Sequence, residues 1–143
     1  MRAAVLREGR IEVRETADPV PGPGQLLVRT LSCAICASDL HFMDNPEGVA
    51  ADDSGLWDYH ADQDIVMGHE FVGEIVGYGP GTERRLPIGT RVTSLPVLIG
   101  RGPVRIIGCS PEAPGGFGEL MLLTESLVRP IPDHVPSDHA ALA

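Results

Sequence analysis

The chain has 143 residues, of which 43% are hydrophobic and 22% are charged. This length suits one domain with a single hydrophobic core, and the composition is typical of a globular protein. Twenty acidic against eleven basic side chains give a formal net charge of −9, which repels phosphate groups and argues against nucleic acid as a partner.

The sequence also bears on location. No segment has the length and apolar character of a membrane span, and residues 1–10 lack the apolar core of a signal peptide. The three cysteines are an odd number without a repeating framework, which favours a reducing compartment over a disulfide scaffold. We therefore expect a cytoplasmic protein that does not enter a membrane.

Short strands between glycine and proline turns dominate the pattern along the chain. A first hairpin is predicted around Gly9, and a stiff proline-rich loop follows it at 19–24. The predicted strands, in chain order, cover 1–6, 11–15, 25–31, 71–78, 91–95 and 119–124. Strands of this length and spacing predict a mainly β fold, a closed or partly open β-barrel.

The remaining segments are less regular. Residues 44–64 are acidic and are predicted to form a long loop, in which Trp57 either lines an apolar pocket or caps the barrel. The apolar segment 95–108 predicts a short hairpin or an interaction surface. A final helix is predicted with Ser137 as its N-cap. Because such a short helix cannot sustain itself, we expect residues 1–143 to be one domain truncated at the start of a connecting helix.

Two separate segments carry the residue types of a metal centre. The first segment carries four reactive groups within six residues, a density unusual for a loop: Cys36, Ser38, Asp39 and His41. The second segment, Gly68-His69-Glu70, places an imidazole beside a carboxylate directly before a predicted strand. A thiolate and an imidazole from separate segments are typical ligands of zinc, and catalytic zinc sites use three protein ligands and one open position.

Four sequence blocks span nearly the whole chain in a fixed order. They are Cys-Ala-Ile-Cys-Ala-Ser-Asp-Leu-His at 33–41, Gly-His-Glu-Phe-Val-Gly-Glu-Ile-Val at 68–76, Gly-Thr-Arg-Val at 89–92 and Gly-Phe-Gly-Glu at 116–119. In order and spacing they resemble the catalytic domain of the zinc-dependent medium-chain alcohol dehydrogenases. The resemblance implies a GroES-like, partly open β-barrel with a few short helices.

The same resemblance implies a catalytic zinc ion. Its ligands would be Cys36 and His69, with Glu70 as a carboxylate able to approach the metal. Asp39 would hydrogen-bond the far nitrogen of His69 and so fix the orientation of the ring. The third ligand of the family falls just beyond Ala143.

The implied reaction is hydride transfer between an alcohol and NAD or NADP. Ser38 would bind the substrate oxygen and take its proton, and His41 would pass that proton to solvent. The Rossmann domain that binds the nucleotide is expected outside this chain, because the glycine-rich turn at 77–81 lacks the Gly-x-Gly-x-x-Gly spacing. We therefore expect no cofactor-binding residue here, an inactive isolated chain, and a full-length homo-oligomer that acts on a small-molecule alcohol or aldehyde.

A structural zinc is not expected. Many family members have four close cysteines before the Gly-Phe-Gly-Glu block, whereas the interval 93–115 holds only Cys109. Cys33 and Cys36 form a Cys-x-x-Cys, but neither the second pair of a zinc ribbon nor a βαβ context is present. Cys33 is therefore predicted to be a buried apolar residue at the end of a strand.

Structural roles stay open beside the functional ones. His69 alone would fit a core histidine, His41 an exposed loop position, and Glu70 an ion pair with a buried arginine. Two other functions also stay open. One is a non-catalytic GroES-like binding or assembly module, and the other is a zinc-independent reductase, although such reductases lack the Gly-His-Glu pattern.

Overall fold

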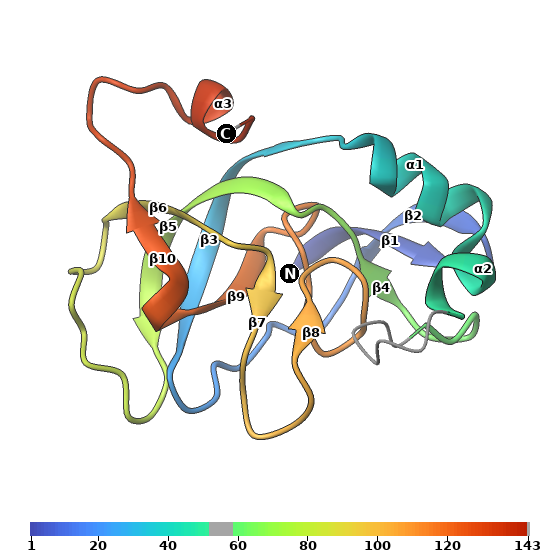
Figure 1. Cartoon of the computed structure of the whole chain (residues 1–143), viewed down its shortest axis with the longest axis horizontal. Helices are drawn as coiled ribbons and strands as arrows, with labels where there is room; N and C mark the ends of the chain where they lie inside the picture. The colour runs from blue at the N-terminus through green and yellow to red at the C-terminus, as the bar shows by residue number, and fades with distance from the viewer. Residues whose placement is uncertain (52–58, 143) are drawn as a thin grey trace.

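The computed structural model of the protein describes residues 1–51 and 59–142 and consists mainly of antiparallel β-sheet (Figure 1). The larger sheet has the order β10-β6-β5-β3-β9. Its strands are β3 (Gln25–Ala34), β5 (Glu70–Tyr78), β6 (Arg91–Ser94), β9 (Leu120–Thr124) and β10 (Val128–Pro130).

A second sheet has three strands in the order β2-β1-β4, and a two-stranded sheet pairs β7 with β8. Glu8 and Gly9 form the two-residue turn between β1 and β2, and both have positive φ, 49° and 71°. The strands of these two sheets are β1 (Arg2–Arg7), β2 (Arg10–Glu15), β4 (Ile65–Val66), β7 (Val97–Leu98) and β8 (Arg105–Ile106).

The helices are short. They are α1 (Ala37–Asp44), α2 (Pro46–Ala50), α3 (Ser137–Ala140) and the 3-10 helix η1 (Glu125–Leu127). Among the described residues, none of the helices has the length and apolar character that crossing a membrane requires.

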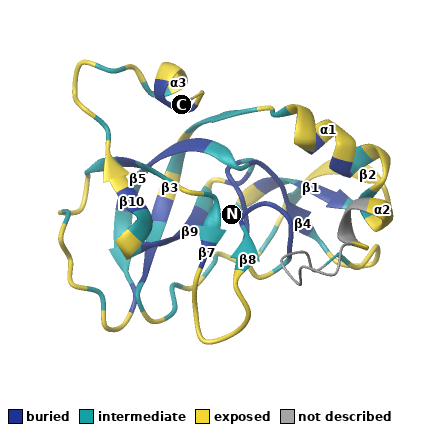
Figure 2. Ribbon diagram, viewed as in Figure 1, coloured by how far each residue is buried: buried dark blue, intermediate teal, exposed yellow. Residues whose placement is uncertain are grey.

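The main core lies on the large sheet. β3 pairs with β5 on one side and with β9 on the other. Consecutive residues are buried in β9 and in the first half of β5, so both faces of the sheet are covered there. Figure 2 shows buried residues in dark blue along β3, β5 and β9, while much of α1 and of the connection from β5 to β6 is exposed. The fully buried members include Val28, Phe71, Ile75, Met121 and Leu123.

All six predicted strands are present, with ends that differ from the expected ones by no more than three residues. The hairpin interpretation of segment 95–108 is confirmed by the pairing of β7 with β8. Strands β4 and β10 were not predicted, because two or three residues carry too little alternation to be read from sequence.

Three predictions about irregular segments differ from the structure. The residues after Cys36 form helix α1 rather than a loop. The loop predicted for 44–64 is wrong at its start, because α2 begins at Pro46, where the Asn45 side chain accepts a hydrogen bond from the Gly48 amide at 3.1 Å. Trp57 lies outside the described residues. The N-cap of the final helix is Pro136, and Ser137 is its first residue.

Candidate metal centre

The pairing of β3 with β5 explains why two distant segments meet. In this antiparallel register Ala34 lies opposite Glu70. The end of β3, which leads to Cys36, therefore lies beside the start of β5, which His69 precedes. Strand pairing thus brings the two predicted ligand segments together where β3 ends and β5 begins.

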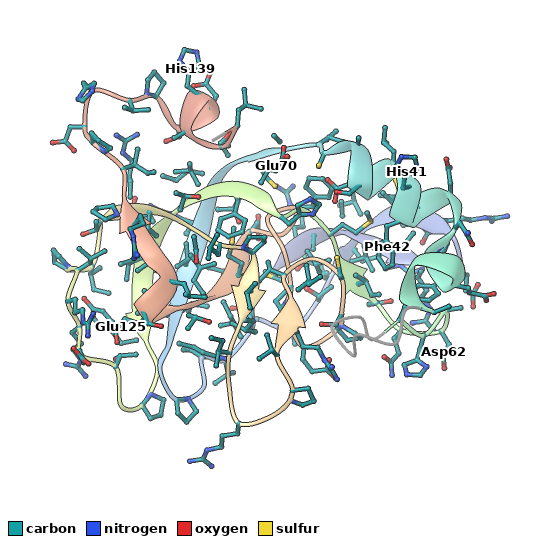
Figure 3. All side chains as sticks on the ribbon, viewed as in Figure 1. His41, Phe42, Asp62, Glu70, Glu125 and His139 are labelled. Carbon is teal, nitrogen blue, oxygen red and sulfur yellow. The ribbon has the colours of Figure 1, made fainter. Side chains whose placement is uncertain are left out.

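Helix α1 is fixed to the body by its two buried residues, Asp39 and Phe42. Phe42 is 2% exposed and packs in one cluster with Leu6 and Met67, on the side of α1 that faces β1 and β4 (Figure 3). Cys36 precedes the first turn of α1 with extended backbone (φ −83°, ψ 154°), and its amide donates to Asp39 Oδ2 at 2.9 Å. This contact closes the first turn and sets the position of the Cys36 thiol.

Three potential metal ligands lie together at this place. The ligand atoms of Cys36, His69 and Glu70 are all within 4.8 Å of one another. Zinc binds sulfur at about 2.3 Å and nitrogen or carboxylate oxygen at about 2.0–2.2 Å, so small side-chain rotations close this group on one ion. All three residues are half-buried, so the group is partly open to solvent.

Both ring nitrogens of His69 face polar groups. Nε2 is hydrogen-bonded to Ser38 Oγ at 2.9 Å. Nδ1 lies 3.3 Å from Asp39 Oδ1, a charge contact in which the atoms are not aligned for a hydrogen bond, and this buried nitrogen has no other partner. The Asp39 carboxylate, 3% exposed, raises the pKa of His69 to about 9, against the lowering effect of burial. The ring is therefore oriented from its far side by a buried carboxylate.

The pKa of the Cys36 thiol shifts downward, whereas that of His69 shifts upward. The Cys36 pKa is lowered from the ordinary thiol value, first because the Ser38 hydroxyl and amide hydrogen-bond to the sulfur and then because His69 does, whereas Glu70 acts in the other direction. Zinc binds the thiolate form of cysteine, so this lowering favours metal binding. A thiol, an imidazole and a carboxylate in this arrangement fit a zinc ion.

The other candidate residues are less closely engaged. His41 is exposed on α1, about one turn beyond Ser38, and no hydrogen bond joins these two residues in the described part of the chain (Figure 3). Cys33 lies near the end of β3 and packs against the core, as predicted, but it is half-buried rather than buried, and desolvation raises its pKa to about 12.

One element of the site was missed by sequence reasoning. Residues 115–117 run beside residues 66–68, which lead into His69, and hydrogen-bond to their carbonyls. The contact joins two segments far apart in the chain, so no local pattern shows which segments meet. The glycines of the Gly-Phe-Gly-Glu block and its neighbours could indicate only that backbone is closely packed there.

Comparison with known proteins decides the family. Residues 22–133 match the model of the alcohol dehydrogenase GroES-like domain. The chain belongs to this family. The predicted fold, a mainly β GroES-like domain with a few short helices, is therefore confirmed.

Several relatives share this domain. L-threonine 3-dehydrogenase of Sinorhizobium medicae is 33% identical over 159 aligned positions, which cover 99% of this chain and 42% of the relative. The enzyme of the same name from Stenotrophomonas maltophilia is 31% identical, with 99% of this chain and 43% of the relative covered. The chain thus spans well under half the length of these relatives.

Solved structures give the same result. A Sinorhizobium meliloti protein described as a zinc-binding dehydrogenase, bound to NADP, superimposes with a TM-score of 0.75 at 30% identity, covering 99% of this chain and 41% of the other. 2R,3R-butanediol dehydrogenase from Bacillus subtilis superimposes with a TM-score of 0.76 at 25% identity, covering 99% and 43%. These relatives and structural neighbours are named as dehydrogenases, and each of them contains this domain as less than half of its length.

Proposed function

We propose that this chain supplies the catalytic zinc site of an alcohol dehydrogenase that transfers hydride between an alcohol and NAD or NADP. The observation that carries the proposal is that the ligand atoms of Cys36, His69 and Glu70 lie within 4.8 Å of one another, where β3 ends and β5 begins. Membership in the alcohol dehydrogenase GroES-like family supports it. The NADP-bound neighbour supports a nicotinamide cofactor, held by a Rossmann domain outside this chain.

Asp39 orients two of the proposed ligands. Its Oδ2 accepts a hydrogen bond from the Cys36 amide at 2.9 Å, and its Oδ1 lies 3.3 Å from His69 Nδ1. Because one rigid carboxylate contacts both segments, the thiol and the imidazole keep their positions relative to each other. Nε2 of His69 is then the nitrogen directed toward a metal ion, and a carboxylate behind the ring increases its basicity.

Ser38 is the proposed substrate-binding hydroxyl. It lies 2.9 Å from His69 Nε2, at the edge of the ligand group, where it can hydrogen-bond a substrate hydroxyl and accept its proton. A bound zinc ion would supply Lewis-acid chemistry, lowering the pKa of the alcohol. His41, exposed about one turn further along α1, is the proposed group that passes this proton to solvent.

We propose a small hydroxyl compound as substrate. The first compound to assay is L-threonine, since relatives at 31–33% identity are L-threonine 3-dehydrogenases. We place the protein in the cytoplasm, as a homo-oligomer in its full-length form, and the three free cysteines are consistent with a reducing compartment. We also propose that Cys109 does not hold a structural zinc.

Metal analysis of the purified protein that contains this chain tests the proposal. Wild-type protein is expected to hold zinc, which Cys36→Ser should remove. Cys109→Ser is the control, because Cys109 is buried and lies outside the ligand group, so this variant should keep its zinc. Stoichiometric zinc in Cys36→Ser would overturn the proposed site, and zinc-free wild-type protein would favour a non-catalytic binding module.

A further inference from the structure

The backbone that leads into His69 is held by a segment from much later in the chain. Residues 115–117 run alongside residues 66–68, and their amides donate to the carbonyls of that segment. Three hydrogen bonds join them: Gly115 to Val66 at 2.8 Å, Gly116 to Gly68 at 2.8 Å and Phe117 to Met67 at 2.9 Å. The position of His69 therefore depends on where residues 115–117 lie.

This contact leaves no room for side chains. A Cβ atom on Gly115 would overlap the carbonyl oxygens of Met67 and Gly68. Gly68 has φ +94°, a left-handed conformation that favours glycine, and a Cβ there would lie 2.7 Å from the Phe117 ring. The two segments thus approach as closely as backbone allows.

The Cys33 sulfur fills the remaining space between them. It would lie 2.7 Å from a Cβ on Gly116 and 2.8 Å from a Cβ on Gly68. Cys33 is fixed in turn by β3, where it pairs with Phe71 on β5, and it packs against the main core. A methyl group on Gly116 must therefore push this sulfur toward Gly68 or spread residues 115–117 away from residues 66–68.

We propose that Gly116 and Cys33 act together as positioning residues for His69. They set the backbone that precedes the ligand, through one close contact between a glycine and a sulfur. The role of Cys33 is the volume of its side chain, and its thiol binds no metal. The inference depends on the proposed metal site, because His69 matters here as a ligand.

Cobalt(II) titration of the protein that contains this chain tests this directly. Cobalt substitutes for zinc, a charge-transfer band reports the bond to Cys36, and the visible bands report the geometry of all ligands. Gly116→Ala should weaken cobalt affinity by about 10- to 100-fold, the range seen when supporting groups of a metal site are lost. Gly102→Ala is the matched control, because a Cβ at Gly102 meets nothing within 4 Å and its φ is not positive, so affinity should not change.

The double variant Cys33→Ala/Gly116→Ala distinguishes positioning from general damage. Removing the sulfur takes away the closest contact of the new methyl group and leaves the Cβ atoms of Cys33 and Phe71 at 3.0 and 3.1 Å. Cobalt affinity and the visible spectrum should therefore return part of the way toward wild type. A loss that persists unchanged in the double variant would overturn the inference. So would a folded Gly116→Ala chain that binds cobalt with wild-type affinity and spectrum.

If Gly116→Ala does not fold, two Cys33 variants test whether the volume of the Cys33 side chain positions His69. Cys33→Ser keeps the size of the side chain and should retain affinity and the charge-transfer band, whereas Cys33→Met adds bulk and should weaken binding. Loss of the charge-transfer band in Cys33→Ser would identify Cys33 as a ligand and overturn the inference. Equal affinity for Cys33→Met and wild type would also overturn it. If the wild-type protein that contains this chain bound no cobalt, the proposed metal site itself would fail.

Discussion

Asp39 is the residue on which the geometry of the site depends most. Its side chain is buried and contacts both the Cys36 amide and the His69 ring. Burying a carboxylate is costly unless it is paired, and here its partners are parts of the proposed metal site. We propose that the buried Asp39 carboxylate holds the two ligands in a fixed orientation.

Asp39→Asn should therefore weaken zinc binding by about 10- to 100-fold, the usual cost of losing a group that supports a metal ligand. The amide keeps the size of the side chain but removes the charge that faces His69 Nδ1. Competition with a chromophoric chelator measures the affinity. The control is Asp62→Asn, at an exposed position (Figure 3), which should not change it. Unchanged affinity in Asp39→Asn would mean that Asp39 does not support the site.

The three thiols should differ in reactivity. Burial raises the pKa of Cys33 and of Cys109 to about 12, while hydrogen bonds from Ser38 lower the pKa of Cys36. Since the thiolate is the reactive form, a group becomes reactive as the pH approaches its pKa from below.

Alkylation with iodoacetamide, followed by peptide mass analysis, checks this order. In the metal-free chain near neutral pH, Cys36 should be modified first, and Cys33 and Cys109 should stay unmodified until far higher pH. Added zinc should protect Cys36. Faster modification of Cys109 than of Cys36 in folded protein would contradict the environments described for the two thiols.

At the scale of elements, Arg91 on β6 anchors the end of the chain. Its guanidinium donates four hydrogen bonds to the segment before and within α3: to the carbonyls of Pro132, Asp133 and Val135 at 2.9, 3.3 and 3.0 Å, and to Ser137 Oγ at 3.1 Å. The planar fork of arginine makes this possible, and lysine cannot reproduce it. The helix that follows places Ala140 and Ala141 against Val72 on β5.

Arg91→Lys should lower the free energy of unfolding by about 1.5–3 kcal/mol, the contribution of one hydrogen bond to a charged group. It should also speed hydrogen exchange at the Ala140 and Ala141 amides, because α3 loses its attachment. Urea denaturation and exchange by NMR measure the two effects. Arg129→Lys is the control, since Arg129 bonds only the carbonyl of the preceding residue among the described contacts. Equal stability of both variants would contradict the anchoring role.

Helix α1 shows why an element can escape sequence reasoning. It has only two buried residues, and one of them is the polar Asp39, so no apolar stripe marks it as a helix. Its start depends on the hydrogen bond that the Cys36 amide donates to Asp39, and its place depends on Phe42, which packs in a cluster with residues of other segments. The reactive residues of 36–41 were found by their types, but their common helix was not.

At the scale of the molecule, the packing of the large sheet sets the register that brings the ligands together. Ile75 is fully buried in the core of this sheet. Ile75→Ala should lower the free energy of unfolding by about 2–5 kcal/mol, because it leaves a cavity that the packed strands cannot fill. Urea denaturation measures the loss. Val13→Ala, at a side chain 75% exposed on β2, should have little effect, and a similar loss in both variants would contradict the core described here.

Strands β3, β5, β6 and β9 of this sheet could be predicted because their strand-forming side chains and their glycine and proline turns are local signals. The three-residue strand β10 could not be predicted. The ligand residues could be proposed because four blocks resembled one family. The contact of residues 115–117 with residues 66–68 could not be predicted, since nothing in either segment specifies its distant partner. Two-residue strands such as β4 likewise exist only through pairing with another part of the fold.

We propose that Cys36 and His69 hold one metal ion. X-ray absorption at the zinc edge, on the protein that contains this chain, identifies the atoms bound to that ion. Wild-type protein should show a sulfur neighbour at about 2.3 Å and nitrogen or oxygen neighbours at about 2.0–2.2 Å. Cys36→Ser should lose most of its zinc, and any zinc that remains should have one sulfur neighbour fewer. A zinc ion without any sulfur neighbour, or an unchanged shell in that variant, would contradict the proposal.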